Sequence, residues 1–116
     1  MKQTTVVADF YTKYGMFYDK YYMKNEEYAL EKYNSFKIGA SSTSPYTKET
    51  IINENTKVYY WLETDKYYPS YYVLQGSIVY DMWSDENNWQ NNQKIFDLLG
   101  IKYTVPNLKN VMQKIS

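Results

Sequence analysis

The sequence predicts an α+β fold in which N-terminal helices precede a three-stranded antiparallel β-meander and two C-terminal helices. Three observations predict this order. Aromatic residues recur at helical spacing in the first third, residues that favour strands alternate with turn signals in the middle, and helix start and stop signals mark the last third. The length of 116 residues suits one hydrophobic core, so residues 1–116 are expected to form a single domain.

The first third predicts helix because aromatic residues recur about every 3.5 residues, which would gather them on one helical face. These residues are Phe10, Tyr14, Phe17, Tyr21 and Tyr28. Gly15 and the β preference of tyrosine oppose this assignment. A β-hairpin that turns at Tyr14-Gly15 is the competing interpretation of residues 5–36.

A new helix is expected after a break near residue 24. Asn25 can cap it, and Glu26 and Glu27 suit its positive N-terminal end. An apolar stripe continues through Ala29, Tyr33 and Phe36. The segment that follows, Gly39 to Thr47, carries turn signals throughout and predicts a loop.

The middle of the chain predicts three strands joined by short turns. The strands are Lys57 to Glu63, Tyr67 to Leu74 and Ile78 to Trp83. Pro69 confines the start of the second strand to an edge or a bulge. Thr64 to Lys66 and Gln75 to Ser77 provide the turns, which makes an antiparallel meander.

The last third predicts two helices packed on one face of the sheet. Ser84 is a candidate N-cap, Gly100 fits the position just after a helix, and Pro106 suits the first turn of the next helix. The apolar stripe of the first helix is Trp89, Ile95, Phe96, Leu98 and Leu99, and that of the second is Leu108, Val111, Met112 and Ile115.

The composition excludes most catalytic and metal chemistry. The chain has no cysteine, no histidine and no arginine, so it lacks an imidazole base, a thiolate nucleophile and an ordinary zinc site. The acids available for a carboxylate-only Mg²⁺ site are Asp65, Asp81, Asp85, Glu86 and Asp97, of which Asp85 and Glu86 are better explained as helix N-terminal charges. We therefore expect no catalytic residue, no metal, no cofactor and no enzymatic activity.

Charge and hydropathy limit the partners. Thirteen lysines balance thirteen acids, so a strong attraction to polyanions is not expected. No apolar run is long enough to cross a membrane, and no signal peptide opens the chain, so we expect a soluble cytoplasmic protein without membrane association. Lysine without arginine, together with ten Asn and sixteen Tyr, is typical of AT-rich coding, which favours a viral (phage) or plasmid origin.

Tyrosine doublets mark the predicted binding surface. In a strand, successive side chains point to opposite faces, so each doublet of the meander would place one ring in the core and one outward. Exposed tyrosine provides large contact area at low entropic cost. The predicted protein-binding residues are Tyr59, Tyr60, Trp61, Tyr67, Tyr68, Tyr71 and Tyr72. Two alternatives remain open: rings that stack on nucleic-acid bases, and cross-strand pairs that only stabilise the sheet.

A second surface predicts DNA binding as an alternative function. The step Leu98-Leu99-Gly100-Ile101, followed by a helix from Pro106, resembles the outline of a helix-turn-helix. The nucleic-acid-binding residues would be Asn107, Lys109, Asn110, Gln113 and Lys114. Phe96 stands where a small residue usually allows close packing, and the turn is about two residues too long. A helical hairpin that closes the core is therefore the preferred interpretation.

The sequence thus predicts a small non-catalytic accessory or inhibitor protein that binds a host or phage protein through a tyrosine-rich surface. The alternatives are a DNA-binding regulator and a structural, virion-type subunit that assembles with itself. All three belong to binding or assembly rather than to catalysis.

Overall fold

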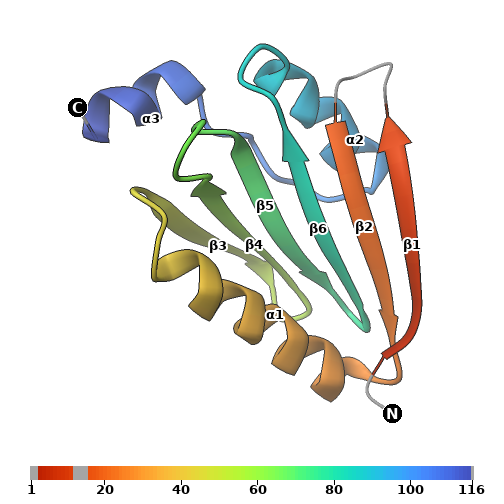
Figure 1. Cartoon of the computed structure of the whole chain (residues 1–116). Coiled ribbons are helices and arrows are strands. Elements are labelled where there is room, and N and C mark those ends of the chain that lie inside the picture. The colour runs from red at the N-terminus through yellow and green to blue at the C-terminus, as the bar shows by residue number, and fades with distance from the viewer. Residues whose placement is uncertain (1–2, 12–15, 116) are drawn as a thin grey trace.

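One antiparallel sheet organises the molecule (Figure 1). The computed structural model describes the backbone of residues 3–11 and both the backbone and the side chains of residues 16–115. The sheet has six strands in the order β1-β2-β6-β5-β4-β3. Their bounds are β1 Gln3–Tyr11, β2 Met16–Met23, β3 Thr47–Asn53, β4 Thr56–Leu62, β5 Pro69–Gln75 and β6 Ile78–Ser84.

The prediction of a helix before residue 24 is wrong. Strands β1 and β2 pair antiparallel instead, as in the competing hairpin assignment, although Tyr14-Gly15 lies outside the described residues. In β2, Met16 and Tyr18 face one side of the sheet and their neighbours face the other. Pairing with β6 buries apolar side chains on both sides, and this tertiary gain outweighs the helical spacing of the aromatic rings.

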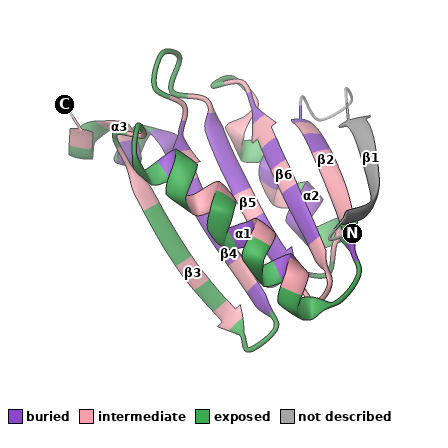
Figure 2. Cartoon of the chain, turned by 60° about the horizontal axis from the view of Figure 1, so that its bottom comes forward, coloured by how far each residue is buried: buried purple, intermediate pink, exposed green. Residues whose placement is uncertain are grey.

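Helix α1 (Glu26–Ser41) begins as the sequence predicted. The side chain of Asn25 accepts a hydrogen bond of 2.9 Å from the backbone N–H of Tyr28, and two acids follow in the first turn. The helix buries Ala29, Tyr33 and Ala40. It crosses one face of the sheet obliquely (Figure 2), and we call this the front face.

The predicted meander is present, but it is the centre of a larger sheet rather than the whole sheet. Strands β4, β5 and β6 are consecutive neighbours, as their sequence predicted. Gly76 is the first of the two residues that connect β5 to β6, and its φ of 61° is the left-handed conformation this turn requires. Pro69 is the first residue of an interior strand, where its missing N–H is tolerated.

Strand β3 was not predicted from the sequence. It reads Thr-Lys-Glu-Thr-Ile-Ile-Asn, and every residue is exposed or only half-buried because the strand forms one edge of the sheet. A solvated edge strand needs little apolar periodicity, so the pattern that reveals interior strands is weak here.

The C-terminal part covers the opposite side, which we call the back face. It contains a 3₁₀ turn (Trp89–Asn91), α2 (Asn92–Leu98) and α3 (Leu108–Ile115). Gly100 follows α2 with a φ of 71°, as its predicted position requires. Ser84 does not cap a helix; it ends β6, and the carboxylate of Asp85 accepts the backbone N–H groups of the turn that follows.

The interior strands are therefore buried on both sides. Along β4, Val58, Tyr60 and Leu62 join the cluster under the C-terminal helices, whereas Tyr59 and Trp61 join the cluster under α1. This double burial explains why these strands read as nearly continuous apolar runs. Within the described part of the chain, every helix falls short of the length and apolarity that crossing a bilayer requires.

Candidate binding site

Three of the predicted binding tyrosines lie inside the protein. The exposed fraction of Tyr60 and Tyr71 is 0% and that of Tyr59 is 8%. The expectation of one outward-facing ring is wrong for the Tyr59-Tyr60 doublet because both faces of the sheet are covered there, whereas Tyr72 of the Tyr71-Tyr72 doublet is half-buried. Helix α1 covers Tyr59, and the C-terminal segment covers Tyr60 and Tyr71, whose rings meet edge to face at 5.3 Å.

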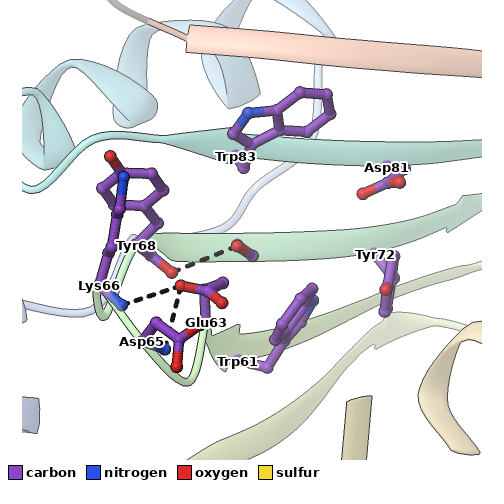
Figure 3. A pocket seen from close by; sticks show the side chains of 9 residues that line it. Trp61, Glu63, Asp65, Lys66, Tyr68, Tyr72, Asp81 and Trp83 are labelled. Atoms are coloured by element: carbon purple, nitrogen blue, oxygen red, sulfur yellow. Dashed lines mark hydrogen bonds between the residues drawn. The ribbon is translucent and has the colours of Figure 1, made fainter. Parts of the chain in front are cut away.

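The other predicted residues gather at one end of the sheet, on the front face. Tyr67 is 37% exposed. Trp61, Tyr68 and Tyr72 line an open cavity of about 440 Å³ (Figure 3). Its remaining lining residues are Glu63, Asp65, Lys66, Ser70, Asp81 and Trp83, and we call the whole site the aromatic cavity.

The register of the sheet creates the aromatic cavity. Trp61 on β4 pairs with Ser70 on β5, and Ser70 pairs with Trp83 on β6. The three side chains therefore form one row across the front face, with a small residue between two indoles. A large side chain at the central position would fill the space, so Ser70 keeps the cavity open.

Stacked rings fix the walls of the aromatic cavity. Tyr72 lies between Phe36 of α1 and Trp61, with ring centroids 4.6 Å and 5.4 Å away and interplanar angles of 13° and 28°. Trp83 stacks on Phe17 of β2 at 5.8 Å. Each stack restricts the rotamers of its rings, so the walls are formed before any ligand arrives.

A carboxylate lies in the next row of the sheet. Asp81 pairs in register with Tyr72 on one side and with Asp19 of β2 on the other. Burial raises the pKa of Asp81 to about 6, the nearby Asp19 carboxylate adds to the rise, and Lys32 of α1 opposes it. Like charges directly opposite each other destabilise a sheet. The repulsion between Asp19 and Asp81 therefore lowers the stability of the fold, and a bound cation would reduce that repulsion.

The connection from β4 to β5 forms the outer wall. The Glu63 carboxylate accepts hydrogen bonds from the backbone N–H groups of Asp65 at 3.2 Å and Lys66 at 2.9 Å. Tyr67 takes a φ of 55°, which is unusual for a residue with a side chain. The Lys66 ammonium lies 5.8 Å from the centre of the Tyr68 ring. These contacts hold the loop beside the aromatic cavity.

The arrangement offers aromatic contact surface and negative charge. Three acids and one lysine line the aromatic cavity. Within the part of the chain that the structure describes, the buried indole N–H of Trp61 has no hydrogen-bond partner. Among the described residues, no group of three or more potential metal ligands comes together.

The alternative DNA-binding residues form a separate surface on the back face. Asn107, Lys109, Asn110, Gln113 and Lys114 are all exposed. Asn107 accepts the backbone N–H of Asn110 at 3.2 Å and so caps α3. Figure 1 shows α2 near β2 and β6 and α3 near the other edge of the sheet, so the two helices do not form the compact pair of a helix-turn-helix. DNA binding by α3 stays a prediction.

Sequence reasoning missed the part of the aromatic cavity that comes from β6. From the sequence, Trp83 only ends the third predicted strand, Asp81 is one acid among several, and Ser70 carries no signal. Counting outward from a two-residue turn at Gly76-Ser77 would have paired Ser70 with Trp83 and Tyr72 with Asp81, because such a turn fixes the register.

Comparison with known proteins adds no relative to this picture. The chain matches no protein-family model, no curated protein sequence and no solved structure. The function is therefore inferred from the geometry of the aromatic cavity.

Proposed function

We propose that this chain is a non-catalytic protein-binding protein whose contact surface is the aromatic cavity and the loop beside it. The observation that carries the proposal is an open cavity with two tryptophans and two tyrosines among its lining residues, at the end of the sheet. Tryptophan and tyrosine dominate the binding energy of protein interfaces, mostly from central pockets surrounded by polar residues.

The rigidity of the site favours this function. Trp61, Tyr72 and Trp83 are each stacked on a neighbour, so little side-chain entropy remains to be lost when a partner arrives. Tyr67 and the loop around it extend the contact surface beyond the rim of the cavity. Such a protein would act as an accessory that holds its partner or as an inhibitor that occludes the partner's own site.

The experiment is affinity capture followed by measurement on the purified pair. A partner identified by mass spectrometry is purified, and its dissociation constant is measured by calorimetry against Trp61→Ser, Tyr68→Ser and Trp83→Ser. We expect each variant to weaken binding at least about tenfold, as truncation of a hot-spot residue does.

The matched control is Tyr22→Ser. Tyr22 is also 37% exposed, and its position in β2 places it on the back face. Unchanged affinity in all three cavity variants, with the control folded and active, would remove the proposal. Light scattering tests self-assembly in the same preparation, because a monomer at every concentration excludes the structural-subunit alternative.

A further inference from the structure

We propose that the aromatic cavity takes a cationic side chain of the partner, with arginine as the best fit, seated between Trp61 and Trp83 and paired with Asp81. The inference rests on the proposed function, because it names the group that the binding surface receives. Three features carry it: the spacing of the two indoles, the sign of the charge and the shape of the cation.

The spacing leaves room for one flat group. Strands β4 and β6 are both neighbours of β5, so Trp61 and Trp83 are two strand spacings apart, about 10 Å at the backbone. Ser70 between them has only a hydroxymethyl group, and its hydroxyl donates to the backbone carbonyl of Tyr68 at 3.2 Å. The volume of about 440 Å³ lies in the range of roughly 300–1,000 Å³ typical of ligand cavities.

The charge favours a cation. Asp65 and Asp81 line the aromatic cavity, and Asp19 lies directly opposite Asp81 on β2. The two nearby lysines are placed against rings: Lys66 lies over Tyr68, and Lys32 lies 4.6 Å from the centre of the Tyr21 ring. A cation would face aromatic surfaces and carboxylates, both of which attract positive charge.

The shape favours arginine over lysine. A guanidinium is planar, stacks on aromatic faces and meets a carboxylate through two parallel hydrogen bonds, whereas an ammonium is a compact and strongly hydrated charge. This chain has no arginine. A second copy of the chain could therefore offer only lysine, and the favoured ligand comes from a different protein.

Cation binding would depend on pH through Asp81. The groups that interact with it are Asp19 and Tyr21 from β2, Tyr72 from β5 and Lys32 from α1. Burial raises the pKa of Asp81 to about 6, and only the ionised carboxylate attracts the cation. Affinity should therefore rise as the pH increases through about 6 and fall on the acid side.

The test uses a short peptide, because the partner is not needed for it. The full chain, labelled with ¹⁵N, is titrated at pH 7.5 with acetyl-Gly-Arg-Gly-amide, and the indole N–H signals are followed by NMR. We expect saturable shifts for Trp61 and Trp83 and none for Trp89, which packs against the cluster on the back face. The citrulline peptide has the same shape without the charge and should cause no shift, and the lysine peptide should bind several-fold more weakly than arginine.

Two variants test whether the NMR shifts depend on the carboxylate of Asp81. Asp81→Asn keeps the shape and should weaken peptide binding at least tenfold. Glu54→Gln removes one negative charge from the turn before β4, at the opposite end of that strand, and should leave binding unchanged. Equal binding of citrulline or of a neutral disaccharide, binding of lysine as tight as that of arginine, or an unaltered affinity in Asp81→Asn would overturn the inference.

This failure can be distinguished from failure of the proposed function. If no peptide binds while Trp61→Ser and Trp83→Ser still abolish capture of the partner, protein binding stands and the arginine site falls. If the partner also binds both variants normally, both proposals fall.

Discussion

At the scale of single residues, Asp81 is placed where its charge is costly. Its carboxylate is largely buried beside aromatic rings and opposite Asp19, and burial raises its pKa from 3.8 to about 6. Between these two values the folded chain binds a proton that the unfolded chain does not. The free energy of unfolding therefore falls as the pH rises through this window, and above about pH 6 the full penalty is present.

The first prediction follows from this penalty. Asp81→Asn should raise the free energy of unfolding at pH 7.5 by roughly 1–3 kcal/mol, because each pH unit of the altered pKa corresponds to about 1.4 kcal/mol. At pH 4 the gain should nearly vanish. Urea unfolding at both pH values measures it, with Glu54→Gln as the control for loss of one negative charge. A variant less stable than the parent at pH 7.5 would show that the carboxylate is satisfied in the fold.

The second prediction concerns a buried phenol. The Tyr33 hydroxyl donates a hydrogen bond of 2.7 Å to the Glu49 carboxylate, which also accepts one of 2.8 Å from Lys37. Tyr33→Phe should lower the free energy of unfolding by about 1.5–3 kcal/mol, as loss of a hydrogen bond to a charged group does. Denaturant unfolding measures the change, and Tyr67→Phe, at a tyrosine that is 37% exposed, serves as its control.

The hydrogen bond between Tyr33 and Glu49 should also make the free energy of unfolding depend on pH. Burial alone would raise the pKa of Glu49, but the hydrogen bonds from Lys37 and Tyr33 outweigh burial and hold the pKa below its usual value. This stabilisation is present above the usual pKa of a glutamate and is lost as the pH falls through the lower, folded value. The parent should therefore lose its advantage over Tyr33→Phe in strong acid.

At the scale of elements, sequence signals succeeded where local chemistry decides the structure. Asn25 caps α1, Gly76 turns the hairpin and Gly100 ends α2, as each residue type predicted. The signals failed where tertiary pairing decides. The aromatic spacing of β2 is compatible with a helical stripe, and only its partners β1 and β6 make it a strand.

The third prediction contrasts two glycines. Gly100 has a φ of 71°, so Gly100→Ala should cost about 1 kcal/mol or more. Gly39 lies inside α1 with open space around its Cα, so Gly39→Ala should stabilise by about 0.5–1 kcal/mol. Thermal unfolding of the two variants in parallel measures both effects. Equal shifts of the same sign would contradict the assignment.

At the scale of the whole molecule, one sheet separates two apolar clusters and belongs to both. The cluster on the back face includes Phe96, and the cluster on the front face includes Met23 and Tyr33. Because alternate residues of β4, β5 and β6 enter each cluster, neither layer can lose its packing without exposing the strands. This sharing could not be predicted from sequence, because β3 lacks a clear strand pattern and the pairing of β2 with β6 joins segments that are far apart in the chain.

The fourth prediction is a single unfolding transition. Phe96→Ala on the back face and Met23→Ala on the front face should each lower the free energy of unfolding by about 2–5 kcal/mol. Far-UV circular dichroism and near-UV dichroism should give coincident curves for each variant. Two resolved transitions, with each substitution shifting only one of them, would show that the layers unfold separately.

The placement of the indoles has a practical consequence. Trp61 and Trp83 line the aromatic cavity, and Trp89 packs against the cluster on the other side of the sheet. Two intrinsic fluorophores therefore lie in the aromatic cavity, where a bound ligand would change their emission. The third lies on the opposite side of the sheet and can serve as a reference. Replacing Trp89 by phenylalanine would leave an emission spectrum that reports only on the front layer, without any attached dye.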